Sequence, residues 1–105
     1  MLIRTVRMTF APESADAFLA LFAAARPKIA ARDGCEHLAL WRDARYPGVF
    51  TTYSLWRDAE ALDAYRHSDL FRETWARTKP MFAAPPEARS QHEVPASGEG
   101  GTPSA

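Results

Sequence analysis

Residues 49–56, Val-Phe-Thr-Thr-Tyr-Ser-Leu-Trp, form the most strand-like stretch of the chain. β-branched and aromatic residues dominate it, and such residues favour β-strands. Apolar side chains fall on both faces of the predicted strand, which indicates that both faces are covered in the folded protein. Asp58 follows in the segment Asp58-Ala-Glu-Ala-Leu62, where an aspartate can cap a short helix. The sequence therefore predicts a strand that leads directly into a helix.

Two more strands are predicted upstream of this one. Residues 35–42 form the second strand, and residues 43–48, which include Pro47 and Gly48, form a hairpin-like connection to the strand 49–56. Residues 2–10 alternate with a period of two and form the first strand. One face of that first strand carries Leu2, Val6, Met8 and Phe10, and Arg4 shares this face.

A helix is predicted between the first two strands. Pro12 and Glu13 suit a first helical turn, because proline lacks an N–H and an acid favours the helix dipole there. Pro27 is expected to kink or divide this helix, and Asp33-Gly34 ends it. A core-facing stripe at helical spacing consists of Ala15, Phe18, Phe22, Ala25 and Ile29.

After residue 62 the pattern weakens toward the C-terminus. Ser68 can cap another helix, and Pro80 and Pro85-Pro86 are expected to close that region. Residues 87–94 form a weak last strand, and residues 95–105, rich in Pro, Gly, Ser and Ala, form a disordered tail. The helical repeat in this region consists of Phe71, Trp75, Thr78 and Phe82.

These elements follow the order β-α-β-β-α-β, which predicts an α+β, ferredoxin-like domain over residues 1–94 with an antiparallel sheet. The helices cover one face of the sheet. The other face presents Thr, Tyr and Leu side chains that need cover, and a second copy of the sheet can supply it. We therefore expect a homodimer.

Composition narrows the function classes. The chain has 105 residues and a formal net charge of zero, without a basic run of the kind that binds nucleic acid or an anionic membrane. The longest apolar stretch, residues 18–25, is too short to cross a bilayer, and Met1-Leu-Ile-Arg4 does not resemble a signal peptide. Cys35 is the only cysteine, so no intrachain disulfide is expected. The sequence predicts a cytoplasmic protein.

Several segments together resemble the antibiotic biosynthesis monooxygenase family. They are Asp33-Gly-Cys35, Thr52-Tyr-Ser-Leu-Trp56, Asp58-Ala-Glu-Ala-Leu62 and Tyr65-Arg-His-Ser-Asp-Leu-Phe71. The resemblance extends from Leu2 to about residue 94. It implies a dimeric α+β barrel in which each subunit holds a pocket between its sheet and its helices. Members include cofactor-free oxygenases of polyphenols and quinols as well as haem-degrading oxygenases.

Two branches of the family can be compared position by position. The haem-degrading branch uses an axial histidine where this chain has Trp75 and an asparagine where it has Val6, which argues against haem degradation. The aromatic-polyketide branch uses an asparagine, a tryptophan, a tyrosine and an arginine. These fall here on Thr52, Trp56, Leu62 and Arg72, so that two match and two do not.

The resemblance implies a cofactor-independent monooxygenase that acts on a hydroxylated aromatic such as a quinol and on dioxygen, with no metal and no cofactor. His67 is the candidate for proton transfer, since an imidazole pKa of about 6.5 suits a base at neutral pH. It is otherwise a partly exposed histidine in a turn between helices. The predicted substrate-binding residues are Thr52, Tyr53, Trp56, Phe71, Arg72 and Trp75.

Other interpretations stay open at this point. The aromatic residues can be core, and Tyr53 can face the dimer core. Arg4 can bind a substrate anion, although an arginine near a chain end more often extends to solvent. Cys35 and His37 lack the further ligands of a zinc site. A non-enzymatic ligand-binding or stress-response dimer is the main alternative function, and a polyketide cyclase or isomerase is a third.

Overall fold

The computed structural model describes residues 1–96. Its element order confirms the α+β, ferredoxin-like fold, and the first three strands begin and end where the sequence predicted. Within the described residues, no helix is long and apolar enough to cross a membrane. The elements are β1 (Leu2–Phe10), η1 (Pro12–Ser14), α1 (Ala15–Ala30), β2 (Cys35–Arg42), β3 (Val49–Trp56), α2 (Ala59–Arg66), α3 (Asp69–Thr78), η2 (Lys79–Met81) and β4 (Phe82–Gln91).

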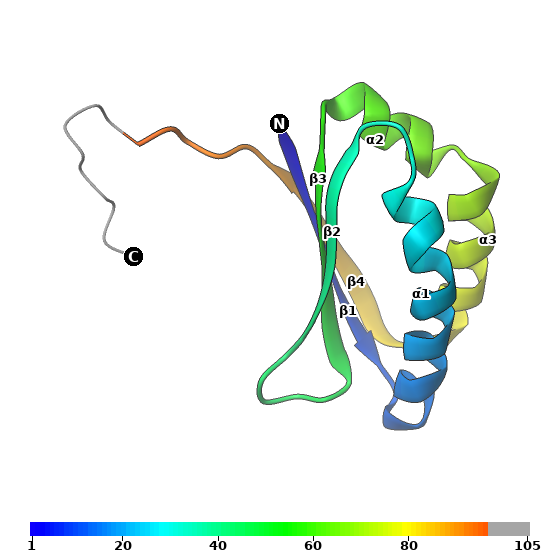
Figure 1. Cartoon of the computed structure of the whole chain (residues 1–105). Coiled ribbons are helices and arrows are strands. Elements are labelled where there is room, and N and C mark those ends of the chain that lie inside the picture. The colour runs from blue at the N-terminus through cyan, green and yellow to red at the C-terminus, as the bar shows by residue number, and fades with distance from the viewer. Residues whose placement is uncertain (97–105) are drawn as a thin grey trace.

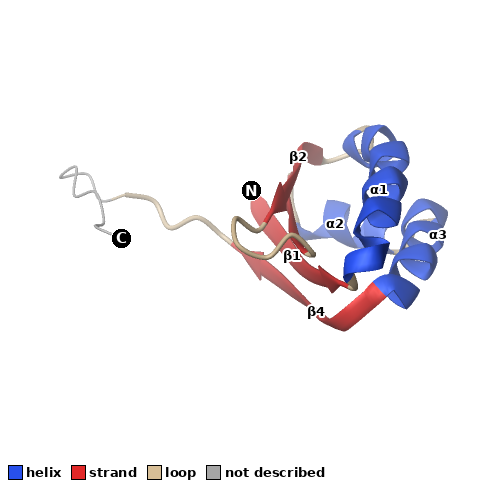
Figure 2. Ribbon diagram, turned by 90° about the horizontal axis from the view of Figure 1, so that it is seen from below, coloured by secondary structure: helices blue, strands red, loops and turns tan. Residues whose placement is uncertain are grey.

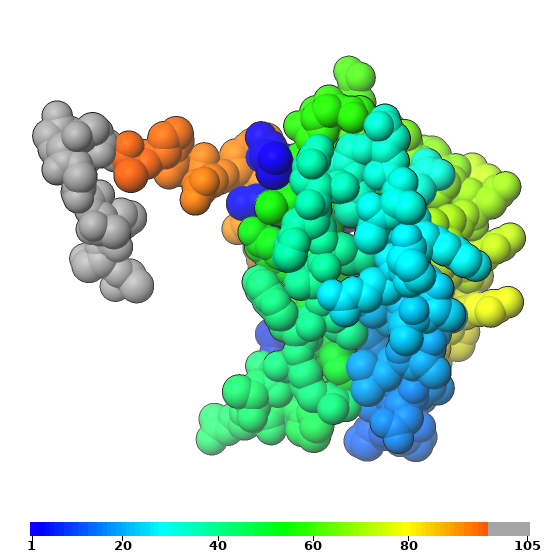
Figure 3. All heavy atoms as spheres, viewed as in Figure 1, coloured from blue at the N-terminus to red at the C-terminus, as the bar shows by residue number. Residues whose placement is uncertain are grey.

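The four strands form one antiparallel sheet in the order β2-β3-β1-β4. All three α-helices lie on the same face of this sheet, as Figures 1 and 2 show from two directions. α1 lies along β2 at the front of the molecule (Figure 3). Within residues 1–96 the opposite face of the sheet carries no helix, so this part of the chain forms two layers.

Alternation along β1 and β3 decides which side chains face the helices. Leu2 pairs with Trp56, and Met8 pairs with Phe50, and all four side chains are buried. The neighbouring positions on each strand point to the uncovered face. The stripe predicted on α1 is confirmed, because the buried residues of that helix are Ala15, Phe18, Phe22, Ala25 and Ile29.

Side-chain caps fix the starts of the two short helices. The Asp58 carboxylate accepts a hydrogen bond from the Ala61 N–H at 2.8 Å. The Ser68 hydroxyl accepts one from the Phe71 N–H at 3.2 Å. Both caps were predicted, and each satisfies an N–H that the helix itself cannot pair. They also set the point at which the chain turns from β3 back over the sheet.

The last strand differs from its prediction. β4 begins at Phe82, not at residue 87, and it includes Pro85 and Pro86, which were expected only to close the preceding helix. β4 is an edge strand, where proline does not break an inner ladder. The register between β1 and β4 shifts at these prolines: Arg7 pairs with Glu87, whereas Thr9 pairs with Ala84. The bulge absorbs the two prolines.

The sequence predicted that Pro27 would kink or divide the first helix, but the helix is not divided. α1 runs without interruption to Ala30, with Pro27 near its last turn. A proline removes only one helical N–H, and Pro27 lies on the exposed side of the helix, where water can bond the carbonyl that it frees. Ala25 and Ile29, on either side of Pro27 in the sequence, are both buried.

The predicted tail, residues 95–105, falls mostly outside the described part of the chain. Residues 97–105 are not among the described residues, and Pro95 and Ala96 have no regular secondary structure. The last strand ends at Gln91. The domain boundary at residue 94 therefore stays a prediction.

Most of the buried apolar side chains belong to one of two clusters. The larger surrounds Phe10, Phe18 and Phe50 toward one end of the sheet. The smaller joins Leu2 and Trp56 to α2 at the other end. The helices are therefore anchored at both ends of the sheet, and a cavity occupies part of the space between the two clusters.

Replacing Pro27 with alanine should stabilise the fold. Alanine restores the lost hydrogen bond and the helix propensity, and the greater freedom of the unfolded chain offsets part of this gain. We expect the free energy of unfolding to rise by about 2 kcal/mol in urea titrations. Lys28→Ala, at an exposed position in the same turn, should change it by only a few tenths of a kcal/mol. A decrease in Pro27→Ala would contradict this account of the helix.

Candidate functional site

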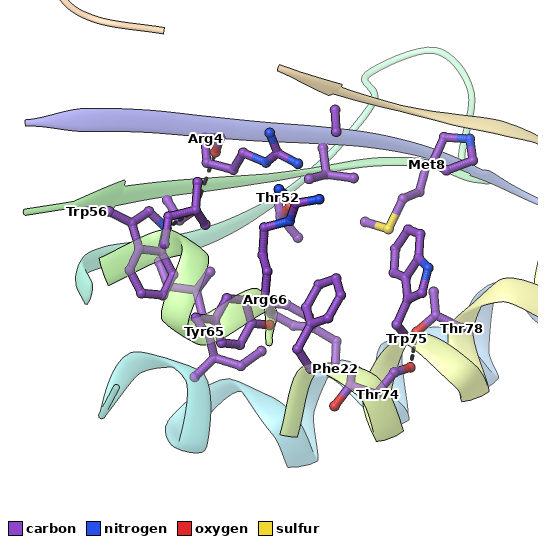
Figure 4. Close-up of a pocket in the computed structure, with 18 of the residues that line it drawn as sticks. Arg4, Met8, Phe22, Thr52, Trp56, Tyr65, Arg66, Thr74, Trp75 and Thr78 are labelled. Atoms are coloured by element: carbon purple, nitrogen blue, oxygen red, sulfur yellow. Dashed lines mark hydrogen bonds between the residues drawn. The ribbon is translucent and has the colours of Figure 1, made fainter. Parts of the chain in front are cut away.

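A cavity of about 300 Å³ lies between the inner face of the sheet and the three helices (Figure 4). This volume is near the lower limit for ligand-binding pockets, and it would hold about ten water molecules. Every strand and every α-helix contributes to the lining. Most of the lining is apolar, so the space favours a small ligand with an apolar body.

Four aromatic rings along one side of the cavity touch in sequence. Trp56 stacks on Tyr65 with ring centroids 5.2 Å apart and an interplanar angle of 19°. Tyr65 meets Phe71 edge to face at 5.3 Å, and Phe71 stacks on Trp75 at 5.8 Å. The rings come from β3, α2 and α3, so this wall forms only when the helices dock on the sheet.

Trp56 is part of the wall and is not a hydrogen-bond donor to a ligand. Its side chain is 1% exposed, and its indole Nε1 donates to the Ser54 hydroxyl at 2.9 Å. The indole N–H therefore has a partner inside the protein, as buried donors require. Ser54 is itself buried and lies two residues earlier on the same face of β3.

Tyr65 brings a phenol to the cavity. Burial is the main cause that raises its pKa to about 12, with a smaller contribution from the Cys35 thiol that exceeds the opposing effect of Arg32. At neutral pH this phenol is therefore protonated. It can donate a hydrogen bond, but it cannot serve as a base.

Two arginine side chains also line the cavity, Arg4 from β1 and Arg66 from the last turn of α2. Arg4 is half-buried, and its guanidinium donates to the Ser90 hydroxyl at 2.9 Å. Burial, and secondarily the positive charge of Arg66, lower the pKa of Arg4. Of the two placements that the sequence left open for Arg4, the one at a ligand site agrees with the structure, because its side chain lines the cavity beneath the helices (Figure 4).

The structure brings four of the predicted substrate-binding residues to the cavity. They are Thr52, Trp56, Phe71 and Trp75. The sequence also allowed these aromatic residues to be core residues. The two roles are compatible, because Trp56 is buried and also lines the cavity.

Two other predicted binding residues lie elsewhere. Tyr53 follows Thr52 on β3 and points to the uncovered face, where it stacks on Trp41 with centroids 4.8 Å apart. Arg72 is exposed on α3 and pairs with Asp69 at 3.4 Å. Neither is among the lining residues of the cavity. Adjacent strand residues face opposite sides of the sheet, which is why Thr52 and Tyr53 separate.

His67, the predicted base, also lies outside the cavity lining. Its side chain is 71% exposed, and its Nδ1 lies 2.8 Å from the Asp63 carbonyl oxygen of its own helix. The Asp63 carboxylate is 3.5 Å from the same nitrogen. A catalytic role for this imidazole stays a prediction, and it would require a water between His67 and the ligand.

Two functional candidates, Tyr65 and Arg66, were not singled out from the sequence. Tyr65 lies three residues after Leu62, and Arg66 lies four residues after it. On a helix this spacing places both on the same side as Leu62. Leu62 was the position at which the resemblance expected a tyrosine. Helical spacing could have identified Tyr65, because this tyrosine lies about one turn after Leu62 on the same side of the helix.

Among residues 1–96 there is no group of three or more His, Cys, Asp or Glu side chains that could hold a metal ion. Cys35 lies beside the Trp56 cluster, and burial raises the pKa of its thiol. The titratable side chains in the cavity lining are Arg4, Tyr65 and Arg66.

Removing the Ser54 hydroxyl should destabilise the protein through Trp56. Ser54→Ala leaves the buried indole N–H without its acceptor, at a cost of about 1–3 kcal/mol in the free energy of unfolding. In a Trp56→Phe background the same change should cost less, by about 1 kcal/mol. Urea titrations of the four proteins measure this coupling. Equal costs in both backgrounds would show that the bond contributes nothing.

Solved structures with the same fold have low sequence identity to this chain. A crystal structure of an antibiotic biosynthesis monooxygenase is 23% identical with a TM-score of 0.86, and the match covers 90% of this chain and 100% of that one. Rv0793 from Mycobacterium tuberculosis is 22% identical with a TM-score of 0.83, covering 91% and 97%. A conserved protein from Methanosarcina mazei Go1 is 21% identical with a TM-score of 0.84, covering 90% and 94%.

A search of curated proteins gives no significant match. The family model for antibiotic biosynthesis monooxygenases, in contrast, matches residues 1–77, which is more than half of the chain. This match agrees with the resemblance carried by the segments around Trp56 and Leu62. The chain therefore belongs to the antibiotic biosynthesis monooxygenase family, and its general function is monooxygenase-like.

Proposed function

We propose that this protein is a cofactor-independent monooxygenase of a hydroxylated aromatic, such as a quinol, and that the cavity beneath its helices is the active site. The observation that carries the proposal is the aromatic-walled cavity, whose lining includes Tyr65 and two arginines. The family membership supports the reaction class. The cavity volume of about 300 Å³ favours a substrate of one or two rings.

In the proposed reaction the substrate supplies all the electrons. The bound phenol loses a proton, and the resulting anion passes an electron to dioxygen. Recombination forms a carbon–oxygen bond on the ring, and the oxygen–oxygen bond then breaks. One oxygen atom stays on the product, and the other leaves as water with two hydrogen atoms that the substrate gives up. A quinol thereby becomes a hydroxyquinone.

The cavity residues would promote this reaction by favouring the anionic substrate. Tyr65 stays protonated, since its pKa is raised to about 12, and can donate a hydrogen bond to the substrate oxyanion. Arg4 and Arg66 stabilise negative charge. No imidazole or carboxylate lies among the described lining residues, so the proton would leave to water at the cavity mouth.

The same absence of a base from the described lining favours a second candidate, a dimer that binds an aromatic ligand without turnover. The two functions differ in a simple way. A ligand that raises the melting temperature without consuming oxygen supports the binding protein. Turnover excludes it.

We also propose that the uncovered face of the sheet pairs with a second copy of the chain. Tyr53 lies at the centre of this face, between Ala39 and Thr5 in the cross-strand register. Trp41 on the same face is 51% exposed. Such aromatic side chains favour burial in an interface. The dimeric α+β barrel that the family resemblance implies would cover them.

Oxygen uptake in the presence of a panel of quinols and polyphenols tests the proposed reaction. We expect uptake above the rate of autoxidation for at least one of them. Tyr65→Phe should lower kcat/KM by about tenfold to a hundredfold, because it removes one donor to the oxyanion. Tyr46→Phe, the same change on the exposed hairpin, should leave kcat/KM as it is.

The His67→Gln variant should be measured in the same assay, because it distinguishes two possible proton acceptors, water and the His67 imidazole. Proton loss to water predicts a smaller effect for this variant than for Tyr65→Phe. A larger effect would make the imidazole the base, as the sequence suggested. If neither the native protein nor any variant takes up oxygen with any of the substrates, the proposed monooxygenase activity is refuted.

Light scattering tests the pairing of sheets. The native protein should have about twice the 11.7 kDa mass of the chain. Tyr53→Glu should shift it to a monomer at micromolar concentration, because the interface would bury an unpaired charge. Ala76→Glu, which adds the same charge on the exposed side of α3, should remain a dimer. A native monomer would contradict the proposal.

A further inference from the structure

Two arginines line the cavity, and neither takes part in an ion pair with another described residue. Arg4 reaches it from the middle of the sheet and Arg66 from α2, and Figure 4 shows both guanidinium groups directed into the space between sheet and helices. The third titratable lining residue, Tyr65, is neutral because its pKa is raised. The described lining therefore has two cations and no anion.

Two carboxylates, those of Glu60 and Asp63, lie near Arg66, since both residues line a second pocket together with it. Among residues 1–96 the ion pairs within 4.0 Å join Arg57 to Asp33 and Asp58, His67 to Asp63, and Arg72 to Asp69. Neither Arg4 nor Arg66 takes part in them. Asp63, one turn before Arg66, approaches His67 at 3.5 Å instead.

Arg4 has only a neutral partner. One of its nitrogen atoms donates to the Ser90 hydroxyl at 2.9 Å, and a guanidinium has five N–H donors. Its neighbours across the inner face of the sheet are Ser54 on β3 and Ser90 on β4, which fix its position without compensating its charge. A half-buried cation with neutral neighbours is a costly arrangement unless an anion joins it.

Arg66 is the outer member of the pair. A cation in the last turn of a helix is favoured by the helix dipole, which explains a positive charge at this position. The dipole does not explain why the side chain extends over the cavity toward a second cation. Two guanidinium groups from different elements that converge on one space form a site for a carboxylate, because each can donate two parallel hydrogen bonds to it.

We infer that the substrate is an aromatic acid: a hydroxylated ring that lies against the wall of Trp56, Tyr65 and Phe71, with a carboxylate held between Arg4 and Arg66. This inference rests on the proposed function for the identity of the ring, and it adds the charged group. A carboxylate by itself would disfavour ionisation of the phenol on the same ring, and the two arginines offset that repulsion.

Anaerobic titration calorimetry compares two probes, 2,5-dihydroxybenzoate and its methyl ester, which differ by one negative charge and one methyl group. The native protein should bind the acid about ten- to a hundredfold more tightly than the ester, since hydrogen bonds to charged groups are the stronger ones. Exclusion of oxygen prevents turnover during the measurement. Equal affinity for acid and ester would overturn the inference.

Variants assign the preference to the two arginines. Arg4→Met and Arg66→Met should each lose about tenfold or more in affinity for the acid and little for the ester. Arg77→Met removes the same charge from an exposed position on α3 and should bind both probes as the native protein does. If Arg4→Met does not fold, Arg4→Lys retains the charge, and its loss for the acid should be intermediate. An equal loss in Arg77→Met would overturn the inference.

The oxygen assay separates this inference from the proposed function. Tight, arginine-dependent binding of the acid without oxygen uptake leaves the anion site in place and refutes the monooxygenase. Turnover of a neutral quinol together with equal binding of acid and ester supports the monooxygenase and refutes the anion site.

Discussion

The stacking of Trp56 on Tyr65 is the contact on which the rest of the site depends. Trp56 ends the third strand, and the short turn to the Asp58 cap brings α2 back so that Tyr65 lies against the indole. The indole is held from the other side by its bond to Ser54. This buried junction keeps α2 at a fixed distance from the sheet, and the space between them is the cavity.

A cavity of this size is compatible with a stable small domain because the core is divided. The phenylalanine cluster anchors α1 to one end of the sheet, and the Trp56 cluster anchors α2 to the other. A cavity lowers stability because the side chains around it make fewer contacts than they would in a solid core. The two anchored ends supply the packing that offsets this loss, and the cost is recovered when a ligand fills the space.

Alternation along the strands divides the functions of the sheet. Thr52 faces the helices and lines the cavity, whereas Tyr53 faces away and stacks on Trp41. Arg4 belongs to the inner set because it shares the face of Leu2 and Met8. The strand that carries part of the apolar core therefore also places a cation near its N-terminal end, and a partly buried charge is stable only with suitable partners.

The sequence by itself determined the elements of the fold. β-branched and aromatic runs, the stripe on α1 and the caps at Asp58 and Ser68 act over one or two turns, so they can be recognised without tertiary structure. The early start of β4 could not be predicted, since the tolerance for Pro85 and Pro86 depends on their lying at the edge of the sheet. The continuity of α1 through Pro27 likewise depended on packing against the core.

The candidate site was predicted only in part. Thr52, Trp56, Phe71 and Trp75 were placed by strand and helix spacing together with the family resemblance. His67 and Arg72 carry suitable chemistry, but their orientation on short helices, away from the cavity lining, was decided by docking on the sheet. Only the tertiary structure brought Arg4 and Arg66 together, because they lie on β1 and α2, and the sequence contains no local signal for two charges that meet across a cavity.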